Sequence, residues 1–233
     1  LVDKDNNKDF FEKLWNTSLD DKKGLTVVEI MDAIHENTIK GMYILGENPA
    51  MSDPDLNHAR EALQMLDHLV VQDIFLTETA TYADVIFPAS AWPEKNGTVT
   101  NTNRQVQMGR KALDSPGEAK EDWWITNELG KRMGLNWKYN HPKEIYEEMS
   151  LTMPSLNNIS WERLENENSV TYPSKSPTTP GDEIVFGDKF PNENGKGKFV
   201  PASVTAPDEV HNNELALILT TGRQLEHWHT GAM

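Results

Sequence analysis

The chain has 233 residues, enough for one large domain or two small ones and for a substantial hydrophobic core. Its 22 lysines and arginines against 37 aspartates and glutamates give a formal net charge of -15, which would repel a phosphate backbone and argues against nucleic-acid binding as a main role. With 0 cysteines, the sequence excludes disulfides, a thiolate nucleophile, a zinc ribbon and a cysteine-bound iron–sulfur cluster on this chain.

The N-terminal region predicts two helices and a buried strand. Residues 8–15, KDFFEKLW, form a short amphipathic run, and residues 26–39 carry apolar side chains on one helical face. Thr26, with Glu29 three positions later, predicts a capping box at the start of this second helix. Residues 41–46, GMYILG, are a short apolar run closed by glycine, which is typical of a buried strand.

The next segment continues the alternation of helices and strands. A loop rich in Gly, Pro, Asp and Asn precedes a helical stretch at residues 56–66, and apolar strands are expected at residues 68–75 and 80–89. The order of strand, helix, strand, short helix and strand is typical of a doubly wound fold. We therefore predict an α/β fold class, with a Rossmann-like parallel sheet and flanking helices.

The regular pattern weakens after this segment. Residues 92–120 predict a loop and hairpin excursion, and helices are expected at residues 121–134 and 142–149. Residues 151–213 are rich in Asn, Ser, Pro, Thr and Gly, and within them only EIVF and GKFV are expected to form strands. Such a segment usually lies over another surface. Residues 214–222, ELALILTTG, predict a final strand.

Polar residues follow the ends of two expected strands. Gly46, Glu47 and Asn48 come after the first strand, and Gln72 and Asp73 end the second. Ligands bind outside the carboxyl ends of strands in an open parallel sheet, where backbone amides and helix N-termini favour anions. An aspartate in this position fits a ribose or a base edge, and an ordinary tight turn with a helix-capping aspartate explains the same pattern. Both interpretations are consistent with the residues.

The last residues, LTTGRQLEHWHTGAM, place two histidines on either side of a tryptophan. If this stretch is a strand, His227 and His229 point the same way, so both imidazoles could reach one ion. No acidic or thiol partner has a recognisable spacing for a zinc site, which favours a hydrogen-bonding or structural role. We therefore expect no metal ligand in this chain.

Four blocks of the sequence, in this order and spacing, resemble a known family. The blocks are YILGENPAMSDPD, LDHLVVQDIFLTETATYADVIFPASAWPEKNGTVTNTNRQVQ, EDWWITNELGKRMG and LILTTGRQLEHWHTGAM. They are similar to the catalytic subunit of molybdenum- or tungsten-dependent formate dehydrogenases, in the class of molybdopterin guanine dinucleotide oxidoreductases. GENP, VVQDIFLTETA and HWHTG favour formate dehydrogenase over nitrate reductase or the large subunit of respiratory complex I.

The resemblance implies a catalytic subunit with two molybdopterin guanine dinucleotides on one molybdenum or tungsten, and a four-iron four-sulfur cluster nearby. Formate would be oxidised to CO2, and electrons would leave through the cluster to electron-transfer subunits, in soluble relatives towards NAD. The family's cluster cysteines, its Cys or selenocysteine metal ligand and its catalytic His and Arg belong upstream of these blocks. We therefore expect an internal fragment, inactive alone, with no catalytic residue of its own.

By the same resemblance, several groups of residues would bind the cofactor. The first loop would be lined by Gly46, Glu47, Asn48 and Ser52, and the second by Gln72, Asp73 and, more loosely, Thr77. Asp122 would lie in the guanosine pocket, where a carboxylate accepts from a guanine N–H. The C-terminal group, Gly222, Arg223, His227, His229 and Thr230, would lie against a pterin or pyrophosphate, because arginine and neutral histidine donate to such oxygens.

The resemblance also implies a domain organisation. Residues 1–91 and 121–142 would form the Rossmann-like dinucleotide-binding domain. Residues 92–120 and 143–212 would be irregular segments that pack towards an iron–sulfur cluster domain or link domains, and residues 213–233 would begin a C-terminal barrel-like domain. The remaining alternatives are another molybdopterin oxidoreductase, of the nitrate reductase or complex I type, and a nucleotide-binding module without catalysis. No membrane span and no signal peptide are expected, so the default location is the cytoplasm.

Overall fold

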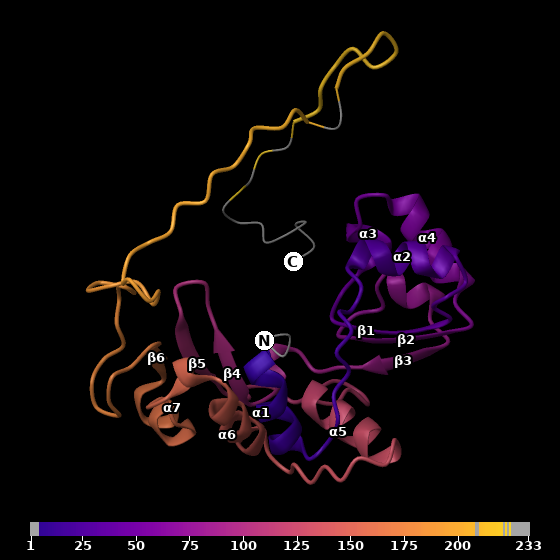
Figure 1. The fold of residues 1–233 in the computed structure, drawn as a ribbon. Coiled ribbons are helices and arrows are strands. Elements are labelled where there is room, and N and C mark those ends of the chain that lie inside the picture. The colour runs from indigo at the N-terminus through magenta and orange to yellow at the C-terminus, as the bar shows by residue number, and fades with distance from the viewer. Residues whose placement is uncertain (1–4, 208–209, 221, 223, 225–233) are drawn as a thin grey trace. The chain divides into compact units, whose positions relative to one another are not determined.

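The computed structural model describes residues 5–207, 210–220, 222 and 224. The chain forms two compact units that divide between Ala89 and Ser90. Each unit has a three-stranded sheet of its own (Figure 1). The sheet of the first unit is parallel and that of the second is antiparallel. The mixed α/β class predicted from the sequence is therefore confirmed.

The first unit alternates helices with strands. Its elements are α1 (Asp5–Trp15), α2 (Val27–His35), β1 (Gly41–Leu45), α3 (Pro49–Ser52), α4 (Leu56–Met65), β2 (His68–Asp73), the 3-10 helix η1 (Thr79–Tyr82) and β3 (Val85–Pro88). The predicted capping box begins α2, with the Glu29 amide 3.4 Å from Thr26 Oγ1 and the Thr26 amide 2.6 Å from Glu29 Oε2. This order of elements is the one predicted from the sequence, except that α3 forms within the predicted loop and η1 occupies the start of the strand expected at residues 80–89.

The strands of the first unit form a parallel sheet in the order β1-β2-β3. Val71 is fully buried at its centre, opposite Ile44 on β1 and Ile86 on β3. Helices α2, α3 and α4 cover one face of this sheet (Figure 1). Tyr43 and Leu45 alternate with the buried positions of β1 and are 38% and 46% exposed, so the described residues cover the other face only partly. Helices on both faces of the sheet stay a prediction.

The second unit combines a hairpin with three helices. Its elements are η2 (Trp92–Glu94), β4 (Gly97–Thr100), β5 (Gln105–Gly109), α5 (Asp122–Arg132), α6 (Pro142–Thr152), η3 (Pro154–Leu156), α7 (Trp161–Glu167) and β6 (Ser169–Thr171). The predicted hairpin is the antiparallel pair β4 and β5, and β6 extends it with Val170 opposite Val106. Helices α5 and α6 form where the sequence predicted them.

The segment from residue 151 to 213 differs from the prediction in both of its halves. Its first half contains α7 and β6, whose Trp161, Leu164 and Val170 are buried in the core of the second unit. Its second half has no strand at EIVF or GKFV, and the Phe199 side chain is 98% exposed. In the first half, the polar composition concealed three apolar positions that pack in the core. In the second half, EIVF and GKFV have no neighbouring strand, so a strand there would leave its backbone groups unpaired.

The final predicted strand does not form in the part that the structure describes. Residues 214–220 have no regular secondary structure, and the Leu217 side chain is 91% exposed. A strand needs a neighbour for its amides and carbonyls, and the described residues supply none here. Residues 221, 223 and 225–233 lie outside the described residues. The C-terminal barrel-like domain therefore stays a prediction.

Candidate functional site

The chain turns sharply at Gly46, directly after β1. This glycine has a φ of +65°, a left-handed conformation that residues with a Cβ adopt at a cost. A Cβ added there would meet no atom within 4 Å, so the conformation, not the lack of space, favours glycine. The Gly46 amide donates to the carbonyl oxygen of Gln72 at 2.9 Å. The loops that follow β1 and β2 consequently begin at the same edge of the sheet.

Asn48 connects the loop after β1 to η1. Its Oδ1 accepts from the amide and the hydroxyl of Thr79 at 3.0 and 2.7 Å, and its Nδ2 donates to Glu78 Oε2 at 2.7 Å. Thr79 is 0% exposed, and its Oγ1 in turn accepts from the Ala50 amide at 3.0 Å. The Asn48 side chain is therefore engaged within the protein and shapes the loop.

Gln72 and Asp73 end β2 at this edge and differ in what they offer a ligand. Gln72 is 0% exposed, and its Oε1 accepts the hydroxyl of Tyr43. Asp73 is half-buried, and its Oδ1 accepts from the amide of Ile74 at 2.7 Å. Its Oδ2 has no hydrogen-bond partner among the described residues. Asp73 therefore retains an acceptor at the edge of the sheet, whereas Gln72 supports the structure beneath it.

Several backbone amides at this edge also have capacity for a ligand. Within the described ranges, the amides of Glu47, Asn48, Phe75 and Leu76 donate no hydrogen bond. The side chains of Phe75 and Leu76 are both 74% exposed, directly after β2. Unpaired amides at the carboxyl end of a parallel sheet can donate to the oxygens of an anionic ligand.

Carboxylates dominate the electrostatics of the same edge. Burial, followed by the negative charge of Glu47, raises the pKa of Asp53 above its usual range. The hydrogen bond from Asn48 lowers the pKa of Glu78 below its usual range, and the positive charge of Arg60 contributes in the same direction. The edge is therefore rich in acceptors. Its carboxylates can accept from the N–H and hydroxyl donors of a ligand. The phosphate oxygens of such a ligand would accept from the backbone amides instead.

A cavity of about 350 Å³ extends along β1 between α2 and α3. Val27, Ile30 and Met31 line its α2 side, and Glu47 with Ser52 lines the end near α3. Ser52, predicted for the first loop, is the last residue of α3. The cavity therefore has an apolar wall and a polar end that adjoins the carboxyl edge of the sheet.

The other predicted site residues have different positions. Thr77 Oγ1 accepts from the Ala80 amide at 3.2 Å, at the start of η1. Asp122 is the first residue of α5, in the second unit, and its carboxylate forms an ion pair with Lys95. Gly222 is exposed and has no regular secondary structure. The remaining four predicted residues, Arg223, His227, His229 and Thr230, lie outside the described residues.

Sequence reasoning missed Tyr43, Glu78 and Thr79, which complete the hydrogen-bond network at this edge. Thr79 lies 31 positions after Asn48, so no local pattern relates the two residues. The only signal was a hydroxyl residue next to apolar Ala80 at the start of a turn.

In the described parts of the chain, no group of three or more His, Cys, Asp or Glu is arranged to hold a metal ion. None of the described helices is long and apolar enough to span a membrane.

Known proteins resemble this chain over nearly its whole length. It is 45% identical over 225 residues to the F420-dependent formate dehydrogenase subunit alpha of Methanocaldococcus jannaschii, covering 96% of this chain and 33% of that protein. It is 44% identical to an F420-dependent formate dehydrogenase 2 subunit alpha of Methanococcus maripaludis, covering 95% of this chain and 33% of the relative. The chain thus spans about a third of the length of these relatives.

A similar fold occurs in a solved structure. Acetylene hydratase from Pelobacter acetylenicus matches 63% of this chain and 20% of its own, with a TM-score of 0.53 and 22% sequence identity. At that identity the likeness concerns the fold alone. The family model for molybdopterin oxidoreductases matches residues 10–132, which is more than half of the chain. The chain therefore belongs to the molybdopterin oxidoreductase family.

Proposed function

We propose that the chain is a section of the catalytic subunit of a molybdenum or tungsten formate dehydrogenase, which oxidises formate to CO2. The observation that carries this proposal is the identity of 44–45% to two formate dehydrogenase alpha subunits over at least 95% of the chain. A putative formate dehydrogenase of Bacillus subtilis is also 41% identical over 224 residues. The substrate would be formate, and electron-transfer subunits would be the partners.

The role we propose for this section is to hold the guanosine end of a molybdopterin guanine dinucleotide. The open carboxylate oxygen of Asp73 can accept from a guanine N–H or a ribose hydroxyl. The unpaired amides of Glu47 and Asn48 can donate to phosphate oxygens. The acceptor-rich edge of the sheet thus fits a nucleoside, and the amides fit its phosphates. Ser52 and Thr77 are further candidates within the first unit, and Asp122, in the second unit, is a candidate on the family resemblance alone.

The residues of this section would bind and position the cofactor without taking part in the chemical step. When bound, the molybdopterin cofactor and its metal would supply the two-electron chemistry of formate oxidation. Because the sequence has 0 cysteines, a four-iron four-sulfur cluster would need ligands outside it. Asn48 and Thr79 would keep the first loop in its shape, and the exposed Phe75 and Leu76 would cover the nucleotide from water.

The activity is tested with the full-length protein, produced in a host that makes molybdopterin guanine dinucleotide. We expect formate-dependent reduction of an artificial electron acceptor and no reduction of nitrate. Coenzyme F420 and NAD are then compared as physiological acceptors, since two relatives are named for F420. Nitrate reduction without formate oxidation would show that the proposed substrate is wrong.

The binding role is tested separately by measuring the GMP that acid hydrolysis releases from the purified protein. Asp73→Asn should lower the GMP content, because an amide cannot accept as well as a carboxylate, and a hydrogen bond to a charged group contributes about 1.5–3 kcal/mol. Asp114→Asn is the matched control, since the Asp114 side chain is 99% exposed. Equal GMP content in the parent and in Asp73→Asn would contradict the nucleotide role while leaving the activity proposal intact.

A further inference from the structure

The second unit contains a cavity of about 310 Å³ that belongs to none of the predicted sites. Its volume is at the lower end of the range of about 300–1,000 Å³ typical of small-molecule sites. Because the residues that line it all belong to the second unit, its geometry does not depend on the first. The side chains that matter here are Asn96, Arg110, Lys111, His141, Trp161 and Glu165.

Arg110, just after β5, is held in place and still has donors to spare. Its Nη1 donates to Asn168 Oδ1 at 2.9 Å, and its Nη2 donates to the carbonyl oxygen of Glu165 at 2.8 Å. A guanidinium group has five N–H donors, so these two bonds fix its plane and leave the others available. The positive charge is thus positioned before any ligand arrives.

Lys111 and Asn96 supply further donors at the same cavity. The Lys111 amide donates to Asn96 Oδ1 at 2.9 Å, and the Nδ2 of Asn96 has no partner among the described residues. Lys111 Nζ lies 3.0 Å from Asp114 Oδ1, and the Asp114 side chain is 99% exposed. Ion pairs this exposed contribute little, because water and salt screen them. The Lys111 ammonium group can therefore also donate to a ligand in the cavity.

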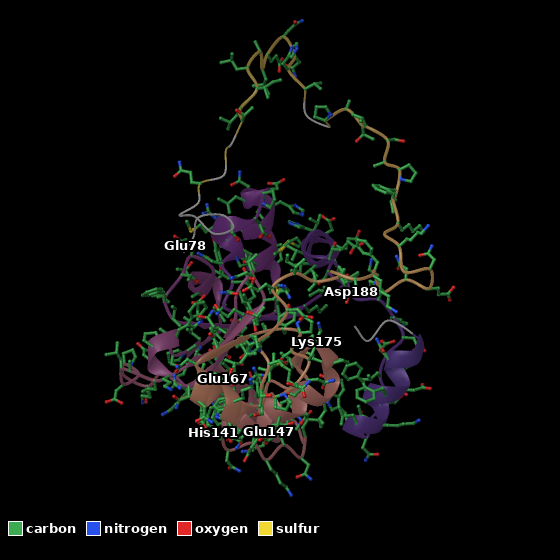
Figure 2. All side chains as sticks on the ribbon, turned by 90° about the vertical axis from the view of Figure 1, so that its left-hand side faces the viewer. Glu78, His141, Glu147, Glu167, Lys175 and Asp188 are labelled. Carbon is green, nitrogen blue, oxygen red and sulfur yellow. The ribbon has the colours of Figure 1, made fainter. Side chains whose placement is uncertain are left out.

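His141 adds a donor whose orientation is fixed by two contacts. Its Nδ1 accepts from the Lys143 amide at 3.1 Å, so the neutral ring carries its proton on Nε2. Its ring lies edge-on to that of Trp161, with centroids 5.5 Å apart and an interplanar angle of 79°. Trp161 is only 3% exposed, so its buried ring supports the ring of His141. His141, labelled in Figure 2, is the N-cap residue of α6 in the second unit.

Acceptors are fewer than donors at this cavity. Glu165 is its only lining carboxylate in the described chain, and its Oε1 already accepts from the indole N–H of Trp161 at 3.0 Å. Donors from Arg110, Lys111, His141 and Asn96 remain, within a protein whose formal net charge is -15. We propose that this cavity binds a small oxoanion, a phosphate or a carboxylate, through these four side chains. The proposal goes beyond formate oxidation and does not depend on it.

The test uses the full-length protein and isothermal titration calorimetry at pH 7 and constant ionic strength. Inorganic phosphate and acetate are titrated in parallel, and saturable binding of either one is the expected result. Lys111→Gln should weaken that binding about tenfold, the usual effect of losing one hydrogen bond to a charged group. Lys138→Gln removes the same charge at an exposed position that does not line the cavity, and should leave the affinity unchanged.

A second variant tests another donor of the cavity, in case Lys111→Gln acts indirectly rather than by removing a contact to the anion. His141→Asn keeps a residue type that caps helices well and removes the imidazole donor, so α6 should persist while anion binding weakens. Circular dichroism checks that the helix content is retained. The proposal is overturned if neither anion binds saturably. It is also overturned if Lys111→Gln and Lys138→Gln weaken binding equally, because the effect would then be general electrostatics.

Discussion

Replacing Thr79 by valine tests the network that holds the loop after β1. The substitution keeps the size and branching of the side chain but removes Oγ1, which donates to Asn48 Oδ1 at 2.7 Å and accepts from the Ala50 amide at 3.0 Å. Thr79 and Ala50 are both 0% exposed, so the Ala50 amide would lose its partner in a dry environment. A buried donor left unpaired costs about 1–3 kcal/mol, and we expect the free energy of unfolding to fall by about 2 kcal/mol.

The assay combines urea unfolding, followed by circular dichroism, with hydrogen exchange measured by mass spectrometry. In Thr79→Val the unfolding midpoint should fall, and the peptide that contains Ala50 should exchange faster. Thr79→Ser retains the hydroxyl and should keep that peptide protected. Thr102→Val is the matched control, because Thr102 is exposed in the turn between β4 and β5. If Thr79→Val matches the parent in both measurements, the network does not hold the loop and our reasoning is wrong.

Three further substitutions probe backbone conformation and ionisation. Gly46→Ala should lower the free energy of unfolding by about 1–2 kcal/mol, because Gly46 has a φ of +65°. Gly24→Ala is the control, since a Cβ there meets no atom within 4 Å, and it should leave the free energy of unfolding unchanged. Equal urea midpoints for the two variants would contradict this prediction. Burial raises the pKa of Tyr139 to about 12 from 10.0, so the folded protein holds this proton more tightly and its stability should fall as pH rises between these values. Tyr139→Phe should remove that part of the pH dependence of unfolding, and an unchanged curve would count against the assignment. Asn48→Ala should raise the pKa of Glu78 towards its ordinary value, which an NMR titration of the carboxyl carbon would measure.

The helices and strands with strong local signals were predictable from the sequence. The capping box of Thr26 and Glu29 placed the start of α2, and the apolar runs placed β1, β2 and β3. Helix α7 and strand β6 were missed, because Trp161 and Leu164 are apolar positions within a polar composition. Their burial depends on a strand more than 50 positions earlier in the chain, which no local window contains.

The candidate site was only partly predictable, for the same reason. The strand ends at Gly46 and Asp73 follow from the pattern of strands, since carboxyl ends of parallel strands meet at one edge. The roles of Asn48 and Gln72 did not follow, because their side chains turn inward to Thr79 and Tyr43. A residue type can show what chemistry is possible, but its partners decide whether that chemistry is available to a ligand.

The sequence by itself determined the family, the alternation of elements and the location of the strand ends. The four blocks that resemble known relatives indicated the family, whereas the elements and strand ends followed because glycine conformation, capping residues and apolar periodicity act within a few residues. Only the tertiary structure decided that Asp73 keeps an open oxygen while Asn48 does not, and that Arg110 and His141 face one cavity. These outcomes depend on contacts between residues far apart in the chain, where packing and hydrogen-bond satisfaction select one arrangement from many that the local pattern allows.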